Sequence, residues 1–150
     1  MRMAKFKMVM RFVFFYCFAG GLYMCLELLY RQRTDWTMFY LAGVVGLLLL
    51  GINEWLDYET DFLLQVFICG SCALLAEFLF GMIFNSDFHI WDYRDLTFNY
   101  KGQVQLYFAF IWYILSAIFI PILDHIDYSM FPRHGMKKPY YKVFGKTIKF

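Results

Sequence analysis

Charged residues are scarce in this sequence, and their scarcity excludes an ordinary soluble domain. Asp, Glu, Lys and Arg make up 17% of the 150 residues, whereas apolar residues make up 61% and aromatic residues 23%. A soluble domain carries about 25% charged and 45–50% apolar residues. The apolar excess is too large for one globular core, and it gathers in long runs without charge. We therefore expect an integral membrane protein.

The longest charge-free runs predict four transmembrane helices. A helix needs roughly 20 mainly apolar residues to cross a bilayer. Residues 102–123 form a run of 22, residues 36–53 form a run of 18, and two further runs contain 15 residues each. The two runs of 15 reach the required length only by including Glu27 and Glu77. The predicted spans of this all-α membrane protein are 9–30, 37–53, 62–84 and 103–123.

Basic residues are divided unevenly between the two sides of these spans. The N-terminal tail holds four Lys and Arg residues and the C-terminal tail six, whereas the two loops on the opposite side hold four in total. Because cytoplasmic segments are enriched in Lys and Arg, we expect both termini in the cytoplasm. The first apolar run continues to Tyr30, which is too long for a cleaved signal peptide. Short connections between the spans favour an antiparallel bundle.

The chain shows no internal repeat and no linker, so residues 1–130 are predicted to form a single transmembrane bundle. Residues 131–150 are expected to form a basic, aromatic cytoplasmic tail. Each juxtamembrane base gains about 1 kcal/mol from anionic lipid headgroups. Because a lipid surface is within reach, we expect lipid and not nucleic acid as its partner. The predicted lipid-binding residues are Arg133, Lys137, Lys138, Lys142, Lys146 and Lys149.

Two carboxylates lie inside predicted spans, and a charge at mid-membrane costs roughly 2.5–3.5 kcal/mol. With both termini inside, Glu27 and Glu77 lie near the outer ends of the first and third helices. Three arrangements remain open. Each side chain can extend to the interface, the two can share an outward-facing polar pocket, or Arg31 and Arg94 can neutralise them.

The long outer loop, residues 85–102, mixes aromatic and charged side chains. One interpretation is an interfacial aromatic belt, followed by Thr97 or Asn99 as the N-cap of the fourth helix. The other is a lid over the glutamate pocket. A metal site from the acids around His89 has weak support, because one histidine is a poor signal. The candidate substrate- or ion-binding residues are Glu77, Glu27, Trp91, Asp92, Tyr93, Arg94, Asn99 and Gln103.

Enzymatic motifs are incomplete. Gly145-Lys-Thr147 matches the end of a phosphate-binding loop, but the required earlier glycine is replaced by Tyr140, so an ATPase would have to be a separate polypeptide. Cys69 and Cys72 form a C-x-x-C pair within an apolar span, where the thiolate nucleophile is suppressed. A thiol oxidoreductase would also need a second, accessible cysteine pair, which the sequence lacks. The pair equally suits a packed helix interface.

Several short motifs resemble the bacterial membrane proteins described as "Putative ABC-transporter type IV". The similarity extends from about residue 20 to 124 and is strongest over residues 77–103. The chain departs from the larger branch of that family at residues 32–45. The resemblance implies a small inner-membrane protein and, through its name, a link to transport. The matching segments are Gly51-Ile-Asn-Glu54, Glu77-Phe-Leu-Phe-Gly81, Trp91-Asp-Tyr-Arg-Asp95 and Asn99-x2-Gly102-Gln103, followed by Trp112.

These observations favour a non-enzymatic membrane component, either a transport subunit or a small carrier, with an outward polar pocket around Glu77. No cofactor or metal is expected. One alternative is an accessory or scaffold protein, which would act through its basic tail and through Ala42 and Gly46, a small-x-x-x-small pair. A membrane thiol oxidoreductase that uses the two cysteines is the second alternative. A homo-oligomer, or a separate membrane or ATPase partner, fits each transport hypothesis.

Overall fold

The computed structural model describes residues 2–149, with side chains from residue 5 onward. Two short antiparallel hairpins accompany its helices, and each helix is long and apolar enough to cross a membrane. The predicted all-α membrane class with four transmembrane helices is therefore confirmed. The elements are α1 (Arg2–Arg31), α2 (Trp36–Trp55), α3 (Phe62–Phe84), β1 (Asn99–Tyr100), β2 (Val104–Gln105), α4 (Leu106–Met130), β3 (Tyr141–Val143) and β4 (Lys146–Ile148).

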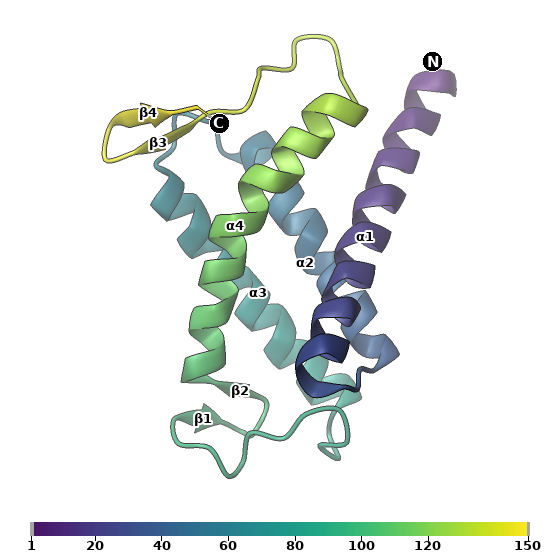
Figure 1. Ribbon diagram of the computed structural model, residues 1–150, viewed down its shortest axis with the longest axis vertical. Helices are drawn as coiled ribbons and strands as arrows, with labels where there is room; N and C mark the ends of the chain where they lie inside the picture. The colour runs from purple at the N-terminus through teal and green to yellow at the C-terminus, as the bar shows by residue number, and fades with distance from the viewer. Residues whose placement is uncertain (1, 150) are drawn as a thin grey trace.

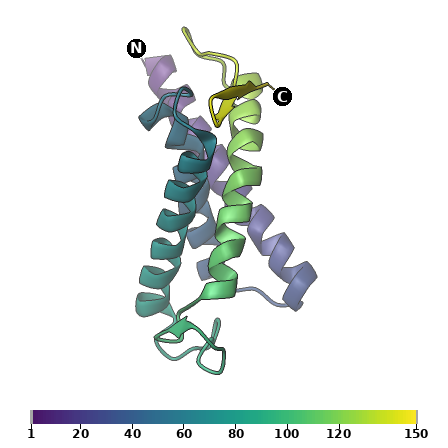
Figure 2. The same cartoon turned by 90° about the vertical axis from the view of Figure 1, so that its left-hand side faces the viewer.

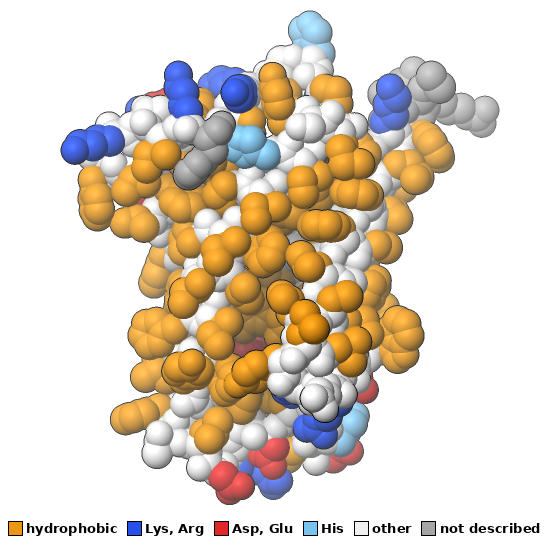
Figure 3. Space-filling view, viewed as in Figure 1, with side chains coloured by type: hydrophobic (Ala, Val, Ile, Leu, Met, Phe, Trp, Pro, Cys, Tyr) orange, Lys and Arg blue, Asp and Glu red, His pale blue; other side chains and the backbone are white. Residues whose placement is uncertain are grey.

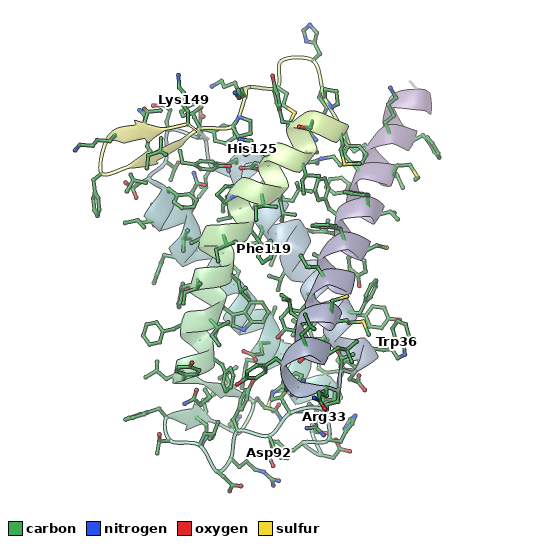
Figure 4. The ribbon with its side chains drawn as sticks, in the orientation of Figure 1. Arg33, Trp36, Asp92, Phe119, His125 and Lys149 are labelled. Atoms are coloured by element: carbon green, nitrogen blue, oxygen red, sulfur yellow. The ribbon has the colours of Figure 1, made fainter. Side chains whose placement is uncertain are left out.

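The helices run in alternating directions, so the first and last described residues lie at one end of the bundle (Figure 1). We call this the termini end. The opposite end carries the α1–α2 connection and the long loop between α3 and α4, and we call it the loop end. In Figure 4, His125 and Lys149 mark the termini end, and Arg33 and Asp92 mark the loop end.

The predicted span 62–84 coincides with α3, whereas α4 begins and ends later than the predicted span 103–123. The fourth helix begins at Leu106, not 103, because residues 99–105 form the β1–β2 hairpin. Neither Thr97 nor Asn99 caps it. The N-cap is Gln105, whose side-chain oxygen accepts from the Phe108 amide at 3.2 Å. The helix also continues past 123 to Met130, because carboxylates in its last turns find donors within the protein.

Small residues bring α1 and α2 into close contact. A Cβ atom added at Gly46 would lie 2.2 Å from the Cβ of Ala19. Gly43 approaches the ring of Tyr16 in the same way, and Gly20 lies against Phe39. The small-residue pattern of α2 is therefore occupied by α1 of the same chain.

The remaining helices are joined mainly through α2. This helix packs against α1, α3 and α4, and α3 also packs along α4. No comparable packing joins α1 to α4 within residues 2–149. Figure 2 shows the consequence at the loop end, where α1 and α4 stand apart. The boundary between α1 and α4, which we call the α1–α4 seam, therefore has few backbone contacts.

An ionic network closes the termini end. Arg11 of α1 is 3% exposed, and its guanidinium donates to both carboxylate oxygens of Asp127, at 2.6 and 2.8 Å. Glu54 of α2 accepts from the same guanidinium at 2.8 Å. Arg133 completes the network with contacts of 2.9 Å to Asp127 and 3.0 Å to Glu54. Three helices are therefore linked by two arginines and two acids.

The basic tail folds back onto this end as the β3–β4 hairpin (Figure 1). Tyr141 is 1% exposed, and its hydroxyl donates to Asp124 of α4 at 2.6 Å. Glu59 accepts from the Tyr140 hydroxyl at 2.6 Å and forms an ion pair with Lys142. The acidic α2–α3 loop is therefore the partner of the hairpin.

We expect Gly46→Ala to destabilise the bundle, because overpacking a close contact costs about 1–3 kcal/mol. The apparent melting temperature in detergent measures the effect. Gly21→Ala in α1 is the matched control, since a Cβ there meets nothing within 4 Å. That control should be neutral or slightly stabilising. Equal melting temperatures for the two variants would contradict close packing at Gly46.

We also expect Arg11→Ala to lower the apparent melting temperature strongly. Removing one partner of a buried ion pair costs about 3–5 kcal/mol, because the remaining charge loses its compensation. Lys7→Ala removes an exposed base from the same helix and should change stability by no more than about 0.5 kcal/mol. A similar loss in both variants would show that general helix charge, and not the network, is responsible.

Candidate functional site

A cavity of about 410 Å³ lies at the loop end between α1 and α4. Its walls come from these two helices and from residues 91–93 of the long loop, and α2 and α3 contribute Met38 and Glu77. Glu27 also lines it. In Figure 3 the hollow appears between hydrophobic side chains, with acidic atoms visible at its depth.

Glu77 is 4% exposed and is held by two neutral donors. The Trp112 indole of α4 donates to its Oε2 atom at 2.9 Å, and the Tyr93 hydroxyl lies 3.5 Å from its Oε1 atom. No ion pair to Glu77 forms among the residues whose side chains are described. The carboxylate is therefore hydrogen-bonded, but no positive charge compensates it.

Aromatic stacking positions both donors. The Trp112 ring lies parallel to Tyr23 of α1, with 5.8 Å between centroids and 7° between planes. Tyr93 stacks on Phe108 at 4.9 Å. Burial raises the pKa of Tyr93, and the nearby Glu77 carboxylate adds to this effect. The Tyr93 hydroxyl consequently stays protonated at neutral pH and remains a donor.

Glu27 has different surroundings from Glu77, although both line the cavity. Arg31 lies one helical turn away and forms an ion pair with it. The Thr34 hydroxyl donates to the other carboxylate oxygen at 2.6 Å. Of the arginines expected to neutralise the glutamates, Arg31 therefore does so for Glu27. Arg94 pairs instead with Asp92 at 2.7 Å and does not contact Glu77.

The long loop forms a folded cap, whose centre is the fully buried Asn85. This side chain donates to the Trp91 carbonyl at 2.6 Å and accepts from the Ile90 amide at 2.8 Å. Gln103 donates to the Asn85 carbonyl at 2.9 Å, and the Trp91 indole donates to the Gln103 carbonyl at 2.8 Å. These bonds hold one side of the cavity wall in place.

The loop thus divides the side chains expected in an interfacial belt. Trp91 is 4% exposed and lines the cavity, whereas Phe98 is 80% exposed, as an interfacial ring would be. Among the other candidates, Asp92 and Tyr93 line the cavity. Gln103 belongs to the Asn85 network, and Asn99 bonds within the β1–β2 turn, where its side chain accepts from the Gly102 amide at 2.9 Å.

Sequence reasoning missed two contributors to this site. Tyr23 is one of several aromatic residues in an apolar helix, and no local pattern distinguishes it. Asn85 directly follows an apolar run, and its position marks the end of α3. Among the residues described, no cluster of three His, Cys, Asp or Glu could hold a metal ion. Cys69 and Cys72 are both free, the first buried and the second exposed.

The six tail bases have unequal surroundings. Arg133 and Lys142 pair with acids, and Lys137 lies 3.8 Å from Asp57. The remaining three are exposed and form no ion pair with a described residue. They are Lys138, Lys146 and Lys149.

A second cavity, of about 480 Å³, lies at the termini end of the bundle beside Asp124, Asp127 and Arg133.

Comparison with known proteins agrees with the resemblance seen in the sequence. The family model described as "Putative ABC-transporter type IV" matches residues 8–137, a range that includes all four helices except the first residues of α1. No curated protein and no solved structure matches the chain. Since the family model covers well over half of the sequence, this chain belongs to the "Putative ABC-transporter type IV" family.

Proposed function

We propose that this protein is a transport component, or a small carrier, that binds a positively charged substrate at Glu77. The supporting observation is a buried carboxylate that lines a cavity and has only neutral donors. Ionisable residues within membrane spans are costly, and they commonly mark a substrate or ion path. A cation in the cavity would supply the charge compensation that Glu77 lacks. Glu27 already has this compensation from Arg31.

The unequal distribution of Lys and Arg supports a bacterial inner-membrane protein with both termini in the cytoplasm. In that orientation the loop end, and with it the cavity, faces outward. The chain has no complete ATP-binding motif, so any ATP-driven transport requires a separate ATPase subunit. Lys138, Lys146 and Lys149 are then available to anionic headgroups on the cytoplasmic face.

The accessory-protein alternative has less support from the contacts described above. It depends on Gly46 and the basic tail as surfaces for a partner. Gly46 packs on Ala19, and part of the tail is bound to the acidic α2–α3 loop. Both surfaces are therefore used at least in part within the chain itself.

The orientation is tested by labelling single cysteines in a variant without native cysteines. Asp87→Cys lies in the exposed part of the long loop, and His134→Cys lies at the termini end. A membrane-impermeant maleimide should label position 87 in intact cells and position 134 only after permeabilisation. The reverse pattern would place the cavity on the cytoplasmic side.

Glu77→Gln tests the binding site itself. Proteoliposomes on a solid-supported membrane are exposed to a panel of inorganic and organic cations, and the transient current is recorded. We expect a current for at least one cation, and its apparent affinity should fall about thirtyfold or more in Glu77→Gln, because losing a buried charge partner costs at least about 2 kcal/mol.

Asp57→Asn provides the control, because this exposed acid lies at the termini end, away from the loop-end cavity. It should keep the wild-type current. Circular dichroism and the melting temperature establish that both variants are folded. A folded Glu77→Gln protein with an unchanged current would exclude Glu77 as the binding group.

A further inference from the structure

The cavity opens sideways, through the gap between α1 and α4. Leu26 of α1 and Ile111 and Leu115 of α4 line this side. The Tyr23–Trp112 stack joins the two helices deep in the cavity, and their backbones stand apart at the loop end (Figure 2). In Figure 3 the hollow lies on the long flank of the bundle, surrounded by hydrophobic side chains. In a membrane this flank faces hydrocarbon, so the opening faces lipid.

An apolar extension continues the cavity toward the middle of the bundle. A smaller cavity of about 50 Å³ lies between α1, α2 and α4, and it shares Tyr23, Leu26, Trp112 and Leu115 with the main cavity. Phe119 and Leu123 line its far part, and Phe119 lies between α4 and α1 near mid-height in Figure 4. An apolar substituent on a ligand held at Glu77 therefore has space along the seam.

Aromatic rings line the cavity that contains the carboxylate. Tyr23, Trp112, Tyr93 and Phe108 form the two stacked pairs, and Trp91 adds another face to the cavity. Cations are attracted to aromatic faces within about 6 Å, and rings grouped in this way recognise quaternary ammonium groups. Such groups donate no hydrogen bond. They therefore need charge and apolar surface, and this cavity combines both.

The aqueous mouth of the cavity is charged, whereas the lateral path is apolar. Arg31 and Arg33 line the cavity toward its aqueous side, and Figure 4 places Arg33 at the loop end. Glu27, which pairs with Arg31, and Asp92 line the same mouth, so a cation arriving from water passes charges of both signs. A cation dissolved in the bilayer instead passes Leu26 and Leu115, which carry no charge.

We infer that the cavity binds lipophilic organic cations, which reach Glu77 from the bilayer through the gap between α1 and α4. The ligand class is a quaternary ammonium or phosphonium centre that carries alkyl or aryl groups. This inference rests on the proposed function and names its substrate class. A lipophilic organic cation is the one occupant that we propose for the seam. A bound lipid or a second copy of the chain in its place would contradict the inference.

Tetraphenylphosphonium is the probe, and its binding to the full chain in detergent is measured by isothermal titration calorimetry. Tetramethylammonium has the same charge with little apolar surface, and triphenylphosphine oxide has similar apolar surface without net charge. We expect the wild-type protein to bind tetraphenylphosphonium at least about tenfold more tightly than either compound. Glu77→Gln should weaken that binding by about thirtyfold or more.

Leu115→Trp tests the seam, because Leu115 lines both the main cavity and its apolar extension. The larger side chain should weaken tetraphenylphosphonium binding, and it should slow association in lipid nanodiscs as followed by tryptophan fluorescence. Ile114→Trp is the matched control. It adds the same ring at the preceding position of α4, where the side chain is 58% exposed and lines neither cavity.

Different experimental outcomes distinguish a failure of this inference from a failure of the proposed function. Tighter, Glu77-dependent binding of tetramethylammonium would overturn the lipophilic class and leave a cation site in place. Equal binding of triphenylphosphine oxide would identify an apolar groove that lipid can fill. Native mass spectrometry showing a dimer closed over the α1–α4 seam would assign the gap to a second copy. If no cation in either panel binds, the proposed function fails as well.

Discussion

A carboxylate inside an apolar bundle needs donors from the protein itself, and the four buried acids among the described residues obtain them in different ways. Glu27 and Asp127 have arginine partners, Arg31 for the first and Arg11 with Arg133 for the second. Asp124 and Glu77 are held by neutral donors. For Asp124 these are Tyr141 and Asn53, and for Glu77 they are Trp112 and Tyr93. The arrangement of helices, tail and long loop follows from supplying these donors.

The two ends of the bundle consequently differ. At the termini end, ion pairs join α1, α2 and α4, and the β3–β4 hairpin covers Asp124. At the loop end, no such network ties α1 to α4, and the helices diverge around Glu77. Close packing through Gly46 and Gly20 holds α1 against α2, and at the loop end the Tyr23–Trp112 stack is its contact with α4. A bundle closed at one end and parted at the other provides a cavity with access from the side.

Much of this architecture could be predicted from the sequence, because membrane spans depend on local composition. The bounds of α3 and the presence of Glu27 and Glu77 near one end follow from counting charge-free residues. The end of α4 could not be predicted in this way. A rule that ends a span at the first charged residue stops at Asp124, because it cannot anticipate the donors Tyr141 and Asn53. The roles of Asn85 and Tyr23 also depend on tertiary contacts and leave no local pattern.

The partners of the two acids near the end of α4 differ in when they are synthesised. Arg11 precedes Asp127 by 116 residues, so it is already in the membrane when α4 leaves the ribosome. Tyr141 follows Asp124 by 17 residues, so it leaves the ribosome after Asp124 has done so. Asp127 can therefore meet Arg11 as soon as it emerges, whereas Asp124 emerges before its hydroxyl donor. Of these two contacts, the one made by the hairpin is the later to become available.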